Sequence, residues 1–229
     1  MSRTLLGARF GQMKEPRSLL DLSTVMPVIS LTDAADAAPV ARAIERSGVP
    51  LILVALDNPV GYAAIERIAA ETPDIIVGAA AVTDMDQPAR ARDAGAEFLV
   101  AGVGHAPMRD AMRATELPHL PGVSNALQAM ELLDDGYTDM VLTSAGAAGG
   151  MRQLKTLAAF TPAARFCATE GIRPGDLPRY LSAPNVGCVV ADWLAPVDAV
   201  RRRDWDRIQR LAEVALKLST PAVTTVRAL

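Results

Sequence analysis

The chain has 229 residues, of which 50% are hydrophobic and 4% are aromatic, and its formal net charge is −3 at pH 7. This length suffices for one sizeable core, and a slightly acidic chain with few aromatic rings is not typical of a nucleic-acid-binding protein. No apolar run approaches the roughly 20 residues that span a bilayer, and charged residues interrupt the first apolar stretches, unlike a signal peptide. We therefore expect a cytoplasmic protein that contacts neither nucleic acid nor membrane.

Short apolar segments alternate with helical segments along most of the chain. The apolar segments begin near Met26, Leu51, Ile75, Phe98, Leu117, Met140, Phe166 and Val186. A 3.6-residue period predicts helices over 34–47, 60–71, 86–94, 106–115, 124–135, 150–160, 174–182 and 196–218. Residues 17–22 suggest a short leading helix after a loosely held arm over 1–15. We therefore expect an arm and leading helix over 1–24, one repeating domain over 25–220 and a tail over 221–229.

The helix boundaries have the residues that such boundaries require. Asp33 and Ser124 are predicted to cap the helices that follow them, whereas Gly48, Gly95 and Gly136 come just after helices, where a left-handed residue is favoured. Eight apolar strands alternating with eight helices indicate the α/β class and a closed parallel (β/α)8, or TIM, barrel. An open doubly wound sheet is the less favoured alternative, because no Gly-x-Gly-x-x-Gly turn follows the first strand.

Three acidic residues, Asp57, Glu170 and Asp192, stand at the carboxyl ends of predicted strands. In a (β/α)8 barrel these ends converge on one mouth, which is where such proteins carry out their chemistry. We predict that the three carboxylates are catalytic and perform acid–base chemistry. A divalent metal at Glu170 and Asp192 is less favoured, because no histidine joins them, and no cofactor is expected. Alternatively, each carboxylate caps a helix or pairs with an arginine, and Asp57 precedes a good helix start.

Other polar residues near the strand ends are candidates for contact with a small-molecule ligand. Thr143 and Ser144 follow the sixth strand and can hydrogen-bond a carbonyl or hydroxyl group, although Ser144 also suits a simple turn. Arg173 stands three residues after Glu170 and could neutralise it or reach a ligand. His105 is a weaker candidate, because a single histidine, like His119, more often has a structural role.

The two cysteines, Cys167 and Cys188, lie in separate apolar strands. They do not suggest a disulfide framework, which fits a reducing compartment. We expect both to be core residues.

Taken in order, several short segments are similar to those of one enzyme family, the 2-keto-3-deoxy-6-phosphogluconate / 4-hydroxy-2-oxoglutarate aldolases. The resemblance extends from about residue 20 to about residue 218 and implies the same barrel, a homotrimer and a site at the carboxyl ends of the strands. The matching segments are 27–29, 76–79, 93–98, 120–124, 149–150, 165–169, 171–172 and 193–194.

The family's reaction depends on residues that this chain replaces. In those aldolases a lysine of the sixth strand holds a pyruvoyl group as a Schiff base, and a glutamate of the second strand moves protons. The resemblance places Val141 at the lysine position and Leu53 at the glutamate position. It also places Asp57 at a family arginine, Ala81 at a threonine and Ser144 at a proline. Thr169, Gly171 and the turn that ends at Ser124 keep the family pattern and are predicted to contact substrate.

Neither a displaced lysine nor a phosphate site restores the family's chemistry. The three lysines, Lys14, Lys155 and Lys217, are not at the carboxyl end of any predicted strand, and a nucleophilic lysine requires a desolvated pocket. The family binds its substrate's phosphate after strands seven and eight, where this chain has Glu170 and Asp192. A carboxylate close to a phosphate costs about 4 kcal/mol at an effective dielectric constant near 20, so we expect an unphosphorylated substrate.

Two main functional interpretations follow, beside a weaker third one in which the chain is a degenerate partner that works only with an active homologue. The first is a repurposed enzyme that performs acid–base chemistry of a lyase, cyclase or isomerase type without a Schiff base. The alternative is a non-catalytic trimer that binds a ligand or serves as a scaffold.

Overall fold

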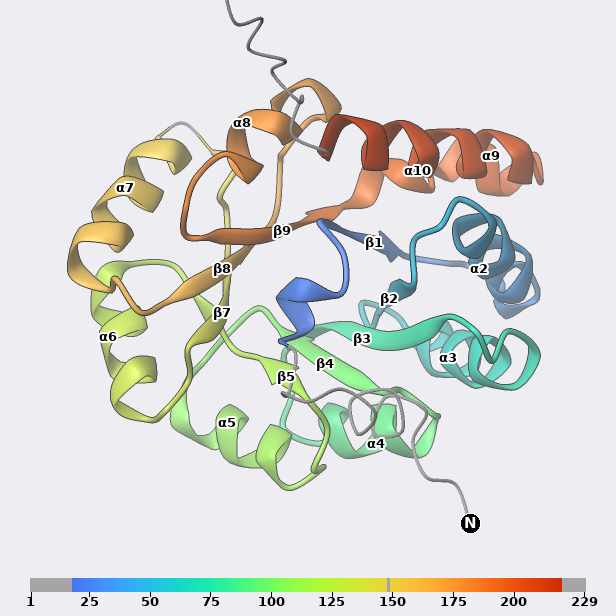
Figure 1. Cartoon of the computed structure of the whole chain (residues 1–229). Coiled ribbons are helices and arrows are strands. Elements are labelled where there is room, and N and C mark those ends of the chain that lie inside the picture. The colour runs from blue at the N-terminus through green and yellow to red at the C-terminus, as the bar shows by residue number, and fades with distance from the viewer. Residues whose placement is uncertain (1–17, 148, 220–229) are drawn as a thin grey trace, which may run out of the picture.

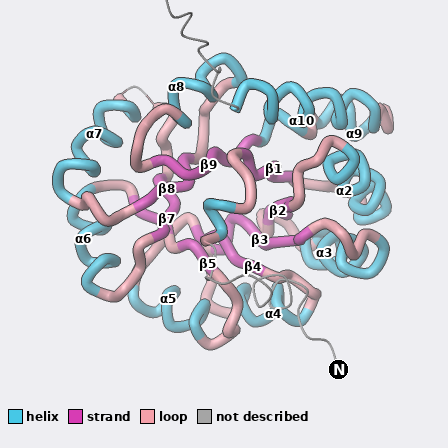
Figure 2. The backbone as a smooth tube through the Cα atoms, in the orientation of Figure 1, coloured by secondary structure: helices cyan, strands magenta, loops and turns pink. Residues whose placement is uncertain are grey.

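The computed structural model describes residues 18–147 and 149–219 and has a ring of parallel strands inside a ring of helices (Figures 1 and 2). In hydrogen-bonded order the strands run β5-β4-β3-β2-β1-β9-β8-β7-β6, and the paired neighbours are parallel. The predicted (β/α)8 architecture is therefore confirmed. The strands are β1 (Val25–Ile29), β2 (Leu51–Ala55), β3 (Ile76–Val82), β4 (Phe98–Ala101), β5 (His119–Leu120), β6 (Gly122–Val123), β7 (Asp139–Leu142), β8 (Arg165–Ala168) and β9 (Val186–Ala191).

The strand predicted from Leu117 onward consists of two short parts, β5 and β6, which stand at the two ends of the pairing order. Only Pro121 separates them, and a proline has no N–H group to donate to a neighbouring strand. Its carbonyl oxygen still accepts a hydrogen bond from the Val141 amide, at 2.9 Å. Because β5 pairs with β4 and β6 pairs with β7, the chain itself closes the barrel here.

Most helices lie where the sequence predicts them, but the last predicted helix, 196–218, is two helices. The backbone at Arg203 turns left-handed, with φ of +54°, and Asp204 starts the second helix by accepting a hydrogen bond from the Arg207 amide. No helix in the described part of the chain is long and apolar enough to cross a bilayer. The helical elements after β1 are η2 (Ala34–Asp36), α2 (Ala37–Arg46), α3 (Val60–Glu71), α4 (Gln87–Asp93), α5 (Ala106–Arg113), α6 (Ala126–Asp134), α7 (Gly150–Phe160), η3 (Pro174–Asp176), α8 (Leu177–Leu181), η4 (Asp192–Leu194), α9 (Val197–Arg201) and α10 (Trp205–Ser219).

One of the two predicted N-caps is confirmed and the other is wrong. The Asp33 carboxylate accepts a hydrogen bond from the second amide after it, at 2.8 Å, and caps η2. In front of α6 the cap is Asn125 rather than Ser124, because the Asn125 side chain accepts from the Gln128 amide at 3.0 Å. Ser124 instead donates its amide and hydroxyl hydrogens to the Gln128 side chain. The glycines predicted after helices have left-handed φ, namely Gly48 (+93°), Gly95 (+102°) and Gly136 (+89°).

The leading helix is a single 3-10 turn, η1 (Leu19–Asp21), which covers the amino-terminal end of the barrel. Figure 1 shows this turn in front of the ring of strands. Its two leucines are buried in the barrel interior, and Asp21 forms an ion pair with Arg165, the first residue of β8, at 2.6 Å. The predicted arm over 1–15 and tail over 221–229 lie outside the described residues.

The core has two layers, as expected of a barrel. One cluster fills the barrel interior, and the other lies between the strands and the surrounding helices. Cys167 and Cys188 are neighbours in the β8–β9 register inside the barrel, where burial raises the pKa of the Cys188 thiol. The expectation that both are core residues is confirmed.

We expect Gly78→Ala to destabilise the barrel. A Cβ atom at this β3 position would lie 2.4 Å from the Phe98 ring, and Phe98 is fully buried, so the ring has little free space to move into. Overpacking of this kind costs about 1–3 kcal/mol, so the midpoint of thermal unfolding should fall by several degrees. Gly175→Ala is the control, because a Cβ there meets no heavy atom within 4 Å. Equal effects of the two substitutions would contradict this account.

Candidate functional site

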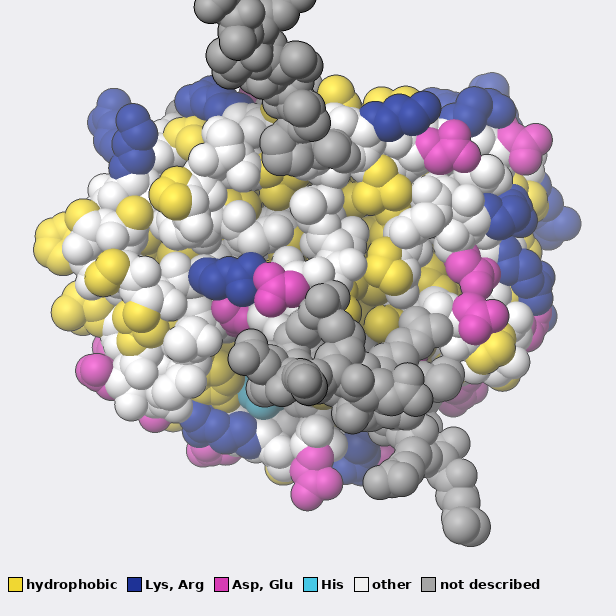
Figure 3. Space-filling view, viewed as in Figure 1, with side chains coloured by type: hydrophobic (Ala, Val, Ile, Leu, Met, Phe, Trp, Pro, Cys, Tyr) yellow, Lys and Arg dark blue, Asp and Glu magenta, His cyan; other side chains and the backbone are white. Residues whose placement is uncertain are grey.

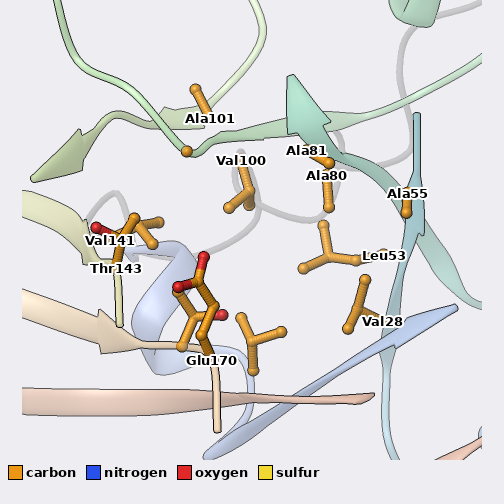
Figure 4. A pocket seen from close by; sticks show the side chains of 13 residues that line it. Val28, Leu53, Ala55, Ala80, Ala81, Val100, Ala101, Val141, Thr143 and Glu170 are labelled. Carbon is orange, nitrogen blue, oxygen red and sulfur yellow. The ribbon is translucent and has the colours of Figure 1, made fainter. Parts of the chain in front are cut away.

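A small cavity of about 160 Å³ opens at the carboxyl ends of the strands, opposite the end that η1 covers (Figure 4). Its walls come from β1, β2, β3, β4, β7 and β9 and from the loops that follow β7 and β8. Aliphatic side chains make up most of this surface, which we call the central pocket. They include Val28, Leu53, Ala80, Val100, Val141 and Val190.

The positions that the resemblance assigns to the family's lysine and glutamate both lie in this apolar floor. Val141 is 1% exposed and Leu53 is fully buried, and Figure 4 shows both side chains at the cavity. Neither side chain can form an imine or transfer a proton. Hydrocarbon surface of this kind holds the apolar part of a ligand by excluding water.

The polar atoms of the central pocket lie on its rim. Thr143 and Thr169 follow β7 and β8, and Glu170 is the only charged side chain among the described lining residues. The Thr143 hydroxyl donates to the Val123 carbonyl at 3.2 Å. In Figure 4 the Glu170 carboxylate lies between Val141 and Thr143 on one side and Leu53 on the other. A carboxylate thus stands beside a hydrocarbon surface.

The Glu170 carboxylate is held by one residue, Ser144. The backbone N–H and the hydroxyl group of Ser144 both donate to Oε2 of Glu170, at 2.9 and 2.8 Å. The other oxygen, Oε1, has no hydrogen bond within the described part of the chain. Charge-assisted hydrogen bonds of this type fix the orientation of a carboxylate. Oε1 therefore remains available to a ligand while Oε2 is anchored.

Both partners have a backbone conformation that side chains rarely adopt. The φ angle is +55° at Ser144 and +66° at Glu170, and Ala81 on the opposite wall has +56°. Left-handed backbone at a residue other than glycine costs roughly 1–3 kcal/mol and tends to occur at functional sites. Two of these residues line the central pocket and the third, Ser144, holds one of them, which indicates a site that the rest of the barrel keeps in place.

The loops after β7 and β8 are joined by their backbones. The amides of Ala145 and Gly146 donate to the carbonyl oxygens of Thr169 and Glu170, at 2.9 and 2.8 Å. A Cβ atom at Gly146 would lie 2.3 Å from the backbone of Gly171, so this close approach requires a glycine. The two loops are therefore held together, and their contact positions Glu170.

A second cavity of about 510 Å³, which we call the lateral pocket, adjoins the central pocket and shares Val28 and Ala55 with it. Asp192 and Trp193, at the end of β9, line the lateral pocket together with Ser30. Glu170 and Asp192, which the sequence predicts at one mouth, thus line adjoining cavities rather than the same one. Sequence reasoning missed Trp193 and Ser30, although Trp193 directly follows a predicted site residue.

Asp57 is joined to the lateral pocket through Ser30, which lines that pocket. Its carboxylate accepts hydrogen bonds from the Ser30 hydroxyl at 2.7 Å and from the Asn58 side chain at 2.9 Å. The suggestion that Asp57 caps the next helix is wrong, because the Asn58 side chain accepts the hydrogen bond from the Val60 amide at 2.9 Å. Asp57 therefore contributes negative charge near the lateral pocket without lining it.

Five of the seven predicted ligand contacts line neither pocket, namely His105, Ser124, Ser144, Gly171 and Arg173. His105 caps α5 through Nδ1, which accepts from the Met108 amide at 3.3 Å. Ser124 is occupied by Gln128, and the Arg173 guanidinium pairs with Asp176 at 3.3 Å rather than with Glu170. Gly171 follows Glu170 in the loop after β8, with φ of +75°.

His119 has the structural role that the sequence suggests. Its ring nitrogens contact the Leu117 carbonyl at 2.8 Å and the Tyr137 hydroxyl at 2.9 Å, and burial is the main cause that lowers its pKa.

The lysines of the described region lie away from both pockets. Lys155 is exposed on α7 and Lys217 is exposed on α10, whereas Lys14 lies outside the described residues. Within the same region, no group of three or more His, Cys, Asp or Glu side chains is placed to hold a metal ion.

Comparisons with known proteins agree with the barrel fold, and the matches extend over most of the chain. The family model of the KDPG and KHG aldolases matches residues 17–211. The 2-dehydro-3-deoxy-phosphogluconate aldolase of Pseudoalteromonas atlantica is 38% identical over 192 residues, which cover 84% of this chain and 89% of the relative.

Two solved structures are similar throughout the barrel. The KDPG aldolase of Legionella pneumophila, with pyruvate captured as a covalent carbinolamine, has a TM-score of 0.83 and 32% identity, covering 86% of this chain and 96% of that one. The 2-keto-3-deoxy-6-phosphogluconate aldolase of Zymomonas mobilis ZM4, with 3-phosphoglycerate, has a TM-score of 0.82 and 35% identity, covering 89% and 96%. The chain therefore belongs to the family of KDPG and KHG aldolases.

Proposed function

We propose that this member of the family performs acid–base chemistry on an unphosphorylated small molecule, without a lysine Schiff base. The reaction is of the lyase, cyclase or isomerase type. The observation that carries the proposal is the Glu170 carboxylate, anchored through Oε2 by two hydrogen bonds from Ser144 at the edge of an apolar pocket.

The aliphatic floor of the central pocket supports a reaction that proceeds without an imine. The Legionella relative captures pyruvate covalently, which requires a nucleophile that reaches the carbonyl carbon. Here the residue at the predicted lysine position is Val141, and neither Lys155 nor Lys217 lines the central pocket. A carbonyl compound would therefore be bound by contacts alone, with Thr143 and Thr169 as the hydroxyl groups at the rim.

The preference for an unphosphorylated substrate is supported by charge. The Zymomonas relative was solved with 3-phosphoglycerate. In this chain Glu170 lines the central pocket and Asp192 lines the lateral pocket, and no lysine or arginine is among the described residues that line either one. A dianion would meet repulsion of about 4 kcal/mol from each carboxylate at close range.

Glu170 is the proposed general base and acid. Its free oxygen, Oε1, takes a proton from a substrate carbon next to a carbonyl or from a hydroxyl group, and then returns it at the next step. Positioned carboxylates contribute about 10²- to 10⁴-fold to such reactions. Asp192 faces the neighbouring cavity and therefore contacts another part of the ligand.

The test is a panel of unphosphorylated 2-oxo acids and hydroxy-2-oxo acids incubated with the protein in D2O and followed by proton NMR. We expect Glu170-dependent exchange or conversion of at least one compound, and no adduct after treatment with pyruvate and borohydride. A borohydride-trapped pyruvate would overturn the proposal. No conversion across the panel, together with saturable binding, would favour the non-catalytic alternative.

We also infer that the protein is a homotrimer of the cytoplasm. Exposed apolar side chains on α6 and α7 support assembly, namely Leu127, Met130 and Phe160, and Figure 3 shows hydrophobic side chains gathered over this side of the barrel. The two free, buried cysteines support a reducing compartment. Light scattering coupled to size exclusion, with Leu127→Asp as the variant, tests the assembly.

A further inference from the structure

The lateral pocket has a composition that suits a positively charged organic group. Among the described residues that line it, Asp192 is the charged one and Trp193 is the aromatic one. Hydrocarbon groups of Val28, Ala195, Pro196 and Val197 form much of the remaining surface. A carboxylate, an aromatic face and apolar walls are the set of groups that binds alkylammonium ions in proteins.

No residue in the described part of the chain forms an ion pair with the carboxylates around this cavity. Neither Asp192 nor Asp57 nor Glu170 forms an ion pair within the described part of the chain. Asp57 is linked to the pocket wall through Ser30. Three carboxylates therefore act on the same mouth, and they favour a cation over an anion or a neutral molecule of equal shape.

We propose that the lateral pocket is a subsite for a small organic ammonium group, which Asp192 pairs with and the Trp193 ring contacts. A bare metal ion is a poorer occupant, because no group of three or more metal-binding side chains is present in the described region. An anion would be repelled by the carboxylates. Because the pocket walls are apolar, the favoured occupant is an ammonium group that carries carbon substituents.

This subsite also defines a substrate class, and that extension rests on the proposed function. The lateral and central pockets share Val28 and Ala55, so one molecule can occupy both. Its ammonium end would lie at Asp192, and its reacting carbonyl or hydroxyl end would lie beside Glu170. The substrates of this protein are then amino-substituted oxo or hydroxy compounds rather than sugar phosphates.

The test uses choline and its uncharged isostere 3,3-dimethylbutan-1-ol as probes. The chain has two tryptophans, Trp193 and Trp205, so the fluorescence and indole N–H resonance of a Trp205→Phe background report on Trp193 alone. We expect saturable binding of choline, with at least tenfold weaker binding of the alcohol. Asp192→Asn should weaken choline binding about tenfold. Asp206→Asn is the control, because Asp206 is an exposed carboxylate on α10 that lines neither pocket.

Because probe binding is measured without turnover, a lack of binding can be distinguished from a lack of the proposed reaction. Glu170→Gln should retain the preference for choline over the alcohol, even where it abolishes conversion of substrate. Equal affinity for the two probes, unchanged choline binding in Asp192→Asn, or no saturable binding would each overturn the subsite.

Discussion

Glu170→Gln is expected to reduce turnover by about 10²- to 10⁴-fold, which is the usual contribution of a positioned acid–base group, while the protein remains folded. The amide oxygen of glutamine can still accept the two hydrogen bonds that Ser144 donates at 2.9 and 2.8 Å. The loop geometry is thereby preserved, whereas the ability to take up a proton is lost. Initial rates on the compound found by NMR, together with thermal unfolding, measure the two effects separately.

A matched control exists elsewhere in the chain. Glu116 is also an exposed glutamate with left-handed φ, at +60°, but it follows α5 and lies away from both pockets. Glu116→Gln should leave turnover unchanged. A large fall in the unfolding midpoint of Glu170→Gln, with catalytic rates intact, would show that Glu170 supports the fold rather than the chemistry.

Val141→Lys is expected to give the barrel the capacity to capture pyruvate. The introduced amine would replace a side chain that is 1% exposed in the apolar floor of the central pocket. Burial of an amine lowers its pKa, by up to about 3–5 units when burial is complete, so part of it would be neutral and nucleophilic at pH 7. Borohydride treatment with pyruvate should then give one adduct per chain, which peptide mass spectrometry locates at this position.

The same substitution should destabilise the protein, because a desolvated amine replaces hydrocarbon contacts. Val141→Met is the control for shape, since methionine extends into the pocket without an amine, and it should trap no pyruvate. Failure of Val141→Lys to trap pyruvate while remaining folded would show that more than the missing lysine separates this chain from imine chemistry. Leu53→Glu in the same background then tests the second missing group.

Much of the fold is predictable from local chemistry. The alternation of apolar strands and helical segments indicates the barrel. Asp33 marks a helix start because its side chain accepts a backbone hydrogen bond, and Gly48 marks a helix end because it adopts left-handed φ. The sequence-based predictions are wrong where tertiary contacts, rather than neighbouring residues, determine the backbone conformation. Pro121 interrupts one strand without ending the sheet, and Arg203 adopts a left-handed conformation that no residue pattern requires.

The site is less predictable than the fold. The positions of Glu170 and Asp192 at the ends of strands follow from counting residues along a repeating chain. The hydrogen-bond partner of Glu170 cannot be predicted in this way, because Ser144 is 26 residues away and reaches Glu170 only through the conformation of its loop. The mouth consists of two adjoining cavities that share Val28 and Ala55, and this arrangement depends on side-chain packing that periodicity does not reveal.

The contact between Ser144 and Glu170 constrains the order of mutations by which this branch of the family arose. A proline, which the resemblance places at position 144 in the relatives, has no amide hydrogen and cannot adopt φ of +55°. A glutamate that appeared at position 170 before the proline was lost would have had neither donor. We therefore expect that the serine preceded the glutamate or arrived with it, and ancestral reconstruction should recover few chains that combine a proline at position 144 with a glutamate at position 170.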